Sequence, residues 1–247
     1  LIDFHMNDSG VYITPASRGA SHTSTALARL DENGAASYTF DLEWAPTAPI
    51  EVPPTAQIIE AGSISAIIEP GASAVLDALA RGREHALICF DPNARPSIMG
   101  EPSAALASLE RFVALADVIK VSDEDIDWLT GGAPIDEVVD RWLGMGVSLV
   151  VVTRGKHGSE VTMASGLRFT KTPSDVEVVD TVGAGDSFMG GMIDAMWGMG
   201  LRGADAREAL RTLPEEQIRA IIDRASAVSD VTVSRKGANP PWAHELS

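Results

Sequence analysis

The sequence predicts an α/β fold in which a mainly parallel central sheet carries helices on both faces. Short apolar runs alternate with helical patterns over residues 56–154, and each run has the length of a buried strand. Such alternation is typical of parallel strands joined by crossover helices. At 247 residues, the chain is long enough for a single domain (residues 1–247) with a substantial core.

The strands and helices of this core follow one another in order. The apolar runs predict strands at residues 56–62, 85–91, 117–122 and 148–154. The helical patterns between and after them lie at residues 72–81, 103–115 and 135–144. Two further helices are predicted near the end of the chain, at residues 187–199 and 214–229.

Two hairpins flank these elements. Residues 21–40 hold two extended runs around a turn at residues 31–34, whose Asn-Gly pair favours a hairpin. A second hairpin is predicted over residues 158–172. We expect the first hairpin to belong to a small β lid within about residues 8–48.

Composition and charge exclude several classes of partner. The chain has 19 Lys and Arg residues against 35 Asp and Glu residues, a net charge of −16. Nucleic acids and anionic membranes bind basic surfaces, so we expect neither as a partner. No apolar run reaches the ~18 residues of a membrane span, and no signal peptide is visible. Cys89 is the only cysteine. These features favour the cytoplasm.

Residues 180–192 (DTVGAGDSFMGGM) carry the strongest functional signal. Gly183, Ala184 and Gly185 have little or no side chain, so a phosphate can approach their backbone N–H groups. A helix that begins here also presents unpaired N–H groups and a partial positive charge. Asp186 lies at this helix start, where it could accept a proton from an attacking hydroxyl. The stretch therefore predicts phosphoryl transfer to an alcohol, although a turn capped by Asp186 would also fit the bare GAGD sequence.

Small or polar residues follow four of the predicted strands. They are residues 62–63, 91–95, 122–125 and 153–155. In open α/β sheets, ligands bind beyond the carboxyl ends of the strands. We therefore expect these segments to meet at one cleft.

The chain resembles the ribokinase-like sugar kinases, also called the PfkB-type family, and is most similar to bacterial fructokinases. The matching stretches are residues 62–63 (GS), 91–95 (DPNAR), 120–125 (KVSDED), 153–159 (TRGKHGS), 180–192 and 235–241 (RKGANPP). One of them departs from the family's N-x-x-E motif, because Ser122 replaces Asn and Asp125 replaces Glu. The resemblance implies a ribokinase-like three-layer α/β/α sandwich with a small β lid.

The resemblance also implies roles for individual residues. Asp186 is the expected general base, with an anion hole formed by Gly183, Ala184 and Gly185. The expected substrate contacts are Asp3, Asp186 and Arg95. The expected nucleotide contacts are Lys120, Ser122, Thr153, Arg154, Gly155, Gly158, Gly185 and Asn239. Asp125 is expected to bind Mg²⁺ through water, and a monovalent cation is expected near Asp180, Val182 and Gly237.

Several of these residues also have a purely structural interpretation. Ser122 and Asp125 have nearly the spacing and chemistry of a helix-capping box, which is compatible with metal binding. An Asp-Pro-Asn sequence forms a turn without any ligand. Asp180 could cap the glycine loop, and residues 153–155 could be a plain turn after a strand.

The beginning of the chain departs from the family pattern. Residues 1–4 (LIDF) resemble the end of the family's first strand, whose Asp contacts sugar hydroxyls. The family's G-G-x-x-x-N substrate motif is then absent near residues 4–7. Either residues are omitted from this sequence at that point, or the segment is deleted, which would remove much of the sugar site.

The resemblance implies an ATP-dependent sugar kinase that uses Mg²⁺, with K⁺ as a candidate activator. Conversion of fructose to fructose 6-phosphate is the preferred reaction, and 2-keto-3-deoxygluconate, ribose and nucleosides are alternative substrates. A non-catalytic sensor of sugar or nucleotide is the alternative from another class. A dinucleotide-dependent oxidoreductase does not fit, because Phe188 stands where its third glycine would fall, and no P-loop motif occurs. We expect a monomer or a homodimer.

Overall fold

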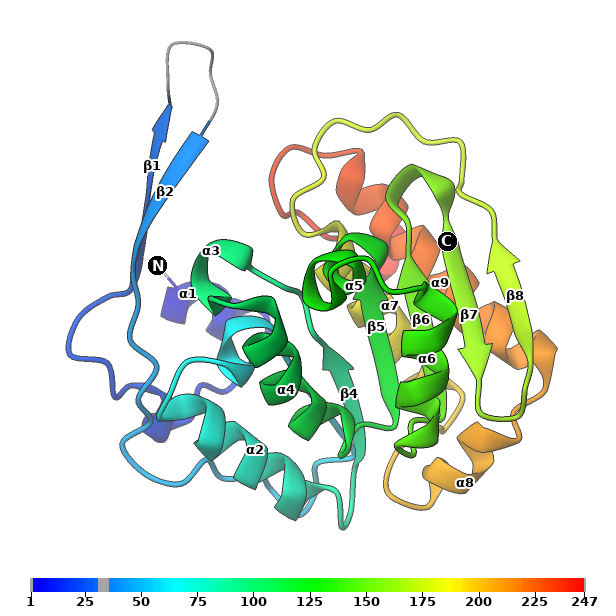
Figure 1. Cartoon of the computed structure of the whole chain (residues 1–247), viewed down its shortest axis with the longest axis horizontal. Helices are drawn as coiled ribbons and strands as arrows, with labels where there is room; N and C mark the ends of the chain where they lie inside the picture. The colour runs from blue at the N-terminus through cyan, green and yellow to red at the C-terminus, as the bar shows by residue number, and fades with distance from the viewer. Residues whose placement is uncertain (1, 31–35, 247) are drawn as a thin grey trace.

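The computed structural model describes residues 2–30 and 36–246 and shows a layered α/β fold (Figure 1). A six-stranded sheet runs in sequence order from β3 to β8. Its strands are β3 (Ile58–Gly62), β4 (Leu87–Asp91), β5 (Val118–Ser122), β6 (Leu149–Thr153), β7 (Ser159–Met163) and β8 (Arg168–Lys171). Strands β3 to β6 pair in parallel, whereas β7 and β8 add antiparallel. The predicted parallel sheet and second hairpin are confirmed.

Helices cover both faces of the sheet, as predicted, and each face has its own apolar core. One core involves α2 (Gly71–Gly82), α4 (Pro102–Val113), α5 (Asp123–Thr130) and α6 (Ile135–Gly144). The other involves α7 (Ala184–Gly198), α8 (Ala206–Arg211) and α9 (Glu215–Val233). Strand β4 contributes alternate residues to both cores and is buried along its whole length, which explains its continuous apolar sequence.

The shorter helices lie mainly in the connections. Helix α3 (Pro96–Met99) follows β4, and 3-10 helices lie at Pro15–Ser17, Ser63–Ala66, Gly155–His157 and Ala243–Glu245. No helix within residues 2–30 and 36–246 is long and apolar enough to cross a membrane.

Helix α7 is held in place by close packing against α9. A Cβ atom added at Gly191 would lie 2.7 Å from the Cα atom of Ala225, so only glycine allows this approach. Gly191 therefore allows α7 and α9 to pack closely. This helix begins three residues earlier than predicted, at Ala184, and α9 continues to Val233.

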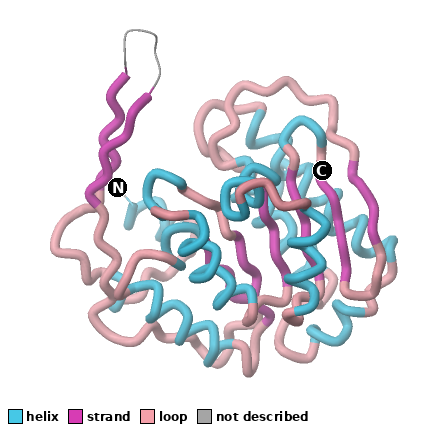
Figure 2. The backbone as a smooth tube through the Cα atoms, viewed as in Figure 1, coloured by secondary structure: helices cyan, strands magenta, loops and turns pink. Residues whose placement is uncertain are grey.

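A separate antiparallel pair, β1 (Thr25–Leu30) and β2 (Ala36–Asp41), extends away from the layered body (Figure 2). This pair confirms the predicted first hairpin. Its predicted turn at residues 31–34 lies outside the described residues.

The start of the chain differs from the prediction. The strand end expected at residues 1–4 is wrong, because Ile2–Asp8 form helix α1. This segment pairs with none of the described strands, so local helical hydrogen bonds satisfy its backbone. Asp3 in the first turn and His5 in the last turn also complement the helix dipole.

Candidate active site

The glycine loop leads directly into α7. Gly183 is the N-cap in the left-handed conformation (φ 79°), and a Cβ atom there would lie 3.0 Å from the Cβ of Ala238. Both observations explain why glycine is needed at this position. Gly185 and Asp186 fall in the first turn, where backbone N–H groups lack partners within the helix. Ala184 differs, because its N–H donates to the carbonyl of Thr181 at 3.2 Å.

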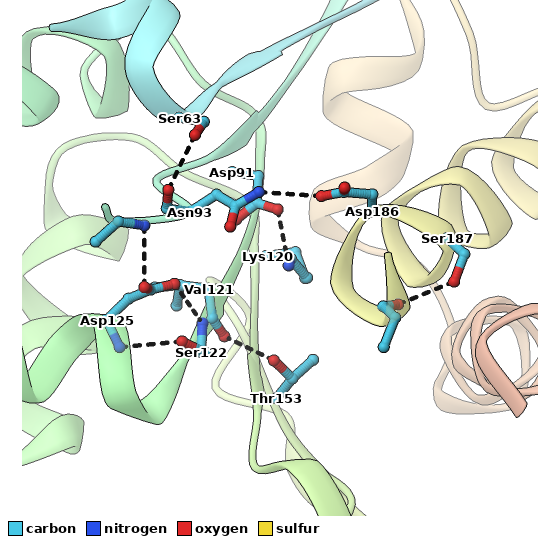
Figure 3. A network of polar contacts seen from close by, with 12 residues as sticks. Ser63, Asp91, Asn93, Lys120, Val121, Ser122, Asp125, Thr153, Asp186 and Ser187 are labelled. Atoms are coloured by element: carbon cyan, nitrogen blue, oxygen red, sulfur yellow. Dashed lines mark hydrogen bonds and ion pairs between the residues drawn. The ribbon is translucent and has the colours of Figure 1, made fainter. Parts of the chain in front are cut away.

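The carboxylate of Asp186 is held from the opposite side of the cleft. The amide Nδ2 of Asn93 donates to Asp186 Oδ1 at 3.0 Å (Figure 3). Asn93 follows β4, so this bond joins the segment after the carboxyl end of β4 to the start of α7. Sequence reasoning identified the DPNAR segment but did not single out Asn93.

A buried ion pair lies under the same turn. Lys120 Nζ lies 2.7 Å from Asp91 Oδ2, and both side chains are nearly inaccessible to solvent. Burial raises the pKa of Asp91 to about 6 although Lys120 opposes the shift. A Cβ atom at Gly185 would lie 2.7 Å from Lys120 Nζ, so the pair directly supports the glycine loop. Lys120 was predicted to contact nucleotide. In the structure its ammonium group pairs with the buried carboxylate of Asp91.

Ser122 and Asp125 form the capping box that their spacing indicates. The Asp125 N–H donates to Ser122 Oγ at 3.0 Å, and the Ser122 N–H donates to Asp125 Oδ2 at 3.3 Å. Asp125 Oδ1 also accepts the N–H of Ala94 at 2.9 Å. Asp125 thus ties the start of α5 to the segment that carries Asn93.

Four of the predicted nucleotide residues, Thr153, Arg154, Gly155 and Gly158, lie where β6 turns into β7. Arg154 forms an ion pair with Glu160 at 2.8 Å, and Thr153 Oγ1 lies 3.4 Å from the carbonyl of Val121. Gly155 opens the 3-10 helix of this turn. Gly158 has φ 89°, and a Cβ atom there would lie 2.0 Å from the carbonyl oxygen of Lys171. The backbone of this turn therefore requires glycine.

Asp180 joins the glycine loop to the C-terminal loop. Its Oδ1 accepts the N–H of Val182 at 3.0 Å, and its Oδ2 accepts the N–H of Gly237 at 2.9 Å. These bonds hold the pKa of Asp180 below its usual value, so the group stays anionic near neutral pH. Asn239 is exposed two residues beyond Gly237.

Comparison with known proteins identifies the family. The sequence model described as "pfkB family carbohydrate kinase" matches residues 2–245. The chain belongs to the pfkB family of carbohydrate kinases. Among curated pfkB relatives, the fructokinase of Rhizobium leguminosarum bv. trifolii is 36% identical over 174 residues, which cover 66% of this chain and 52% of that protein. The chain spans about half the length of the curated relatives it matches.

Solved structures of pfkB-type kinases share the fold. The Vibrio cholerae fructokinase with bound fructose, ADP and calcium ion is 26% identical, with a TM-score of 0.73 over 96% of this chain and 76% of that one. The aminoimidazole riboside kinase of Salmonella enterica, with aminoimidazole riboside and an ATP analogue, is also 26% identical. Its TM-score is 0.78, over 99% of this chain and 79% of that one.

In this pfkB chain, one cleft of about 1100 Å³ brings together residues from β3, β4, α2, α7 and the loops around them. Its polar lining includes Glu60, Asp91, Asn93, Arg95 and Asp186. A smaller adjoining pocket of about 390 Å³ lies between the β1–β2 hairpin and the segments that follow β3 and β4, with Ala26 and Phe40 on one side and Ser63 and Arg95 on the other. Arg95 thus borders both spaces.

Asp3 is not part of this cleft. It lies on α1, where its carboxylate forms an ion pair with Arg18 at 2.6 Å, and both side chains are more than half exposed. The placement of Asp3 as a substrate contact depended on a strand at residues 1–4, but residues 2–4 lie in helix α1.

Glu60 is a cleft residue that sequence reasoning missed. It lies on β3 and lines the cleft, and its register partner is Cys89 of β4. The cleft walls restrict hydration of its carboxylate, and the Asp91 and Asp186 carboxylates add repulsion, which together raise its pKa to about 7. A lone acidic residue in an apolar strand was the available signal.

Proposed function

We propose that the protein is an ATP-dependent sugar kinase that transfers the γ-phosphoryl group of ATP to a hydroxyl of fructose, giving fructose 6-phosphate. One observation supports this most strongly: Asp186 lies in the first turn of α7, directly after the glycine loop and on the wall of a large cleft. A proton acceptor beside unpaired backbone N–H groups is the arrangement that phosphoryl transfer to an alcohol requires.

In the proposed reaction, Asp186 accepts the proton as the sugar oxygen attacks the γ-phosphorus. The bond from phosphorus to the bridging oxygen breaks, and ADP leaves with that electron pair. The N–H groups at the start of α7 stabilise negative charge on the phosphoryl oxygens. Such transfer depends mainly on positioning and electrostatics. The hydrogen bond from Ser229 Oγ of α9 to the carbonyl of Ala184, at 3.1 Å, helps to position the first turn of α7.

The residues near the cleft fit a cation bound through water better than one bound directly. Both oxygens of Asp125 already accept backbone N–H groups, so Asp125 would hold Mg²⁺ through coordinated water. When bound, Mg²⁺ would neutralise charge on the phosphate oxygens. Asp180, anchored to Val182 and Gly237, is the anionic group suited to a monovalent cation such as K⁺.

Fructose is the preferred substrate because curated relatives of this chain are fructokinases. The structural likeness to a riboside kinase supports a nucleoside as the second candidate. Ribose and 2-keto-3-deoxygluconate follow, and a non-catalytic sensor remains the alternative of another class.

The test is ATP consumption, coupled through ADP, against fructose, ribose, 2-keto-3-deoxygluconate and adenosine with Mg²⁺, with and without K⁺. Turnover on fructose with little on the others is expected. Turnover on another compound of the panel would assign that compound as the substrate. Absence of turnover on the whole panel would overturn the proposed activity and favour the sensor.

A further inference from the structure

Asn93 holds the proposed general base although it has no part in the transfer itself. We infer that Asn93 is a positioning residue: it fixes the carboxylate of Asp186 through Oδ1 and leaves Oδ2 to accept the substrate proton. The bond from Asn93 Nδ2 to Oδ1 is 3.0 Å long, and within the described part of the chain Oδ2 has no hydrogen-bond partner. This inference rests on the proposed kinase function.

The amide of Asn93 can adopt only one orientation. Its Oδ1 accepts a hydrogen bond from Arg95 Nη1 at 2.6 Å, while its Nδ2 donates to Asp186. A guanidinium only donates and an ionised carboxylate only accepts, so a flipped amide would lose both bonds. Arg95 therefore determines which end of the amide meets Asp186.

The backbone at Asn93 is also specially held. Asn93 (φ 38°) and Ser63 (φ 56°) are the two non-glycine residues with positive φ among those that the structure describes. Ser63 Oγ donates to the carbonyl of Asn93 at 3.1 Å (Figure 3). Uncommon backbone conformations that are held by their surroundings cluster at functional sites. Here Ser63 follows β3 and Asn93 follows β4, and Asn93 in turn contacts Asp186 in the first turn of α7.

These contacts have a kinetic consequence. Asp186 is exposed, so without Asn93 its carboxylate is free to rotate. Loss of a hydrogen bond to a charged group, with loss of alignment, should lower kcat by about 10- to 100-fold. Binding of ATP and sugar should change little, because Asn93 is assigned to the base rather than to either substrate.

Two variants separate positioning from a backbone role. Asn93→Gly removes the amide but accepts positive φ, and Asn93→Asp keeps the side-chain shape but replaces the donor with an acceptor. The control is Asn7→Asp on α1, an exposed position where the same chemical change occurs away from the cleft. Steady-state kcat and KM for fructose and ATP are measured for all three and for the unmodified protein.

The expected result is a lower kcat for both Asn93 variants, with both KM values within about twofold and the control unchanged. Unchanged kcat in both variants would overturn the inference and leave Asn93 as a turn residue. A loss confined to the KM for fructose would also overturn it, because Asn93 would then be a substrate contact. If the unmodified protein consumed no ATP with any sugar, the proposed function would fail first, and this inference with it.

Discussion

At the residue scale, Gly185 lies where any side chain would meet the buried Asp91–Lys120 pair. We expect Gly185→Ala to push Lys120 or the first turn of α7 out of place, because the lysine tip is held at 2.7 Å by Asp91 and cannot move aside freely. Overpacking of this kind costs about 1–3 kcal/mol of stability, and displacement of Asp186 should lower kcat about tenfold or more.

The matched control for this variant is Gly198→Ala at the far end of α7. A Cβ atom at Gly198 has nothing within 4 Å, so the change should leave kcat alone and stabilise the helix by up to ~1 kcal/mol. Thermal unfolding and kcat are measured for both variants. Equal behaviour of the two would contradict the role assigned to the ion pair.

The residues of the glycine loop were predictable because their chemistry is local. Gly183, Gly185 and Asp186 are close in sequence, and the helix start that they mark needs no knowledge of other segments. Asn93 and Glu60 were not predictable in the same way. Their roles depend on which residues β3 and β4 bring beside α7, and that register is set by long-range packing rather than by neighbouring residues.

At the scale of elements, the Asp91–Lys120 pair joins β4 to β5 beneath α7. Lys120→Met would leave a buried carboxylate without its partner, at a cost of about 3–5 kcal/mol, or roughly a 10 °C fall in Tm. Lys171→Met breaks the more exposed pair with Asp223, and should cost no more than about 1 kcal/mol.

The Lys120→Met effect should also depend on pH. Burial holds the pKa of Asp91 at about 6 in the folded state, above its unfolded value, so the folded protein binds more protons. Stability therefore falls as pH rises from the unfolded pKa of Asp91 to its folded pKa of about 6. Loss of Lys120 should raise the folded pKa further and so widen this pH range. The Tm deficit should be larger at pH 8 than at pH 5, and a deficit independent of pH would contradict burial of this charge.

Element boundaries show where the sequence pattern was sufficient. Strands β4, β5 and β6 were predicted because they are apolar runs that are buried along all or nearly all of their length. The start of α7 was placed three residues late, because glycines carry little helical preference. In the structure, Ser229 Oγ of α9 donates to the carbonyl of Ala184 at 3.1 Å. A strand end was predicted at residues 1–4 because their sequence resembles the end of the family's first strand. Residues 2–4 lie in α1 instead, and no described strand pairs with them.

At the scale of the whole molecule, the β1–β2 hairpin and the layered body meet at the smaller pocket. Replacing residues 25–41 with a short Gly-Ser linker should leave both cores intact, because neither core includes any hairpin residue whose side chain the structure describes. It should remove the wall that includes Ala26 and Phe40. We expect the KM for fructose to rise several-fold while the KM for ATP and the Tm stay nearly constant, as for a lid over the sugar.

An increase in the KM for ATP alone would contradict this placement of the sugar. A large fall in Tm would instead show that the hairpin is part of the folded core. Circular dichroism melting and initial rates on the same preparation distinguish the two results.

The most direct test of the account compares the unmodified protein with Asp186→Asn. Rates of ADP formation from MgATP and fructose are measured alongside ATP binding by calorimetry. Loss of a general base typically costs about 10²–10⁴ in rate, so we expect kcat to fall by that factor while ATP binds as before. An unchanged kcat in the Asp186→Asn variant would contradict the central claim that this carboxylate accepts the proton during phosphoryl transfer.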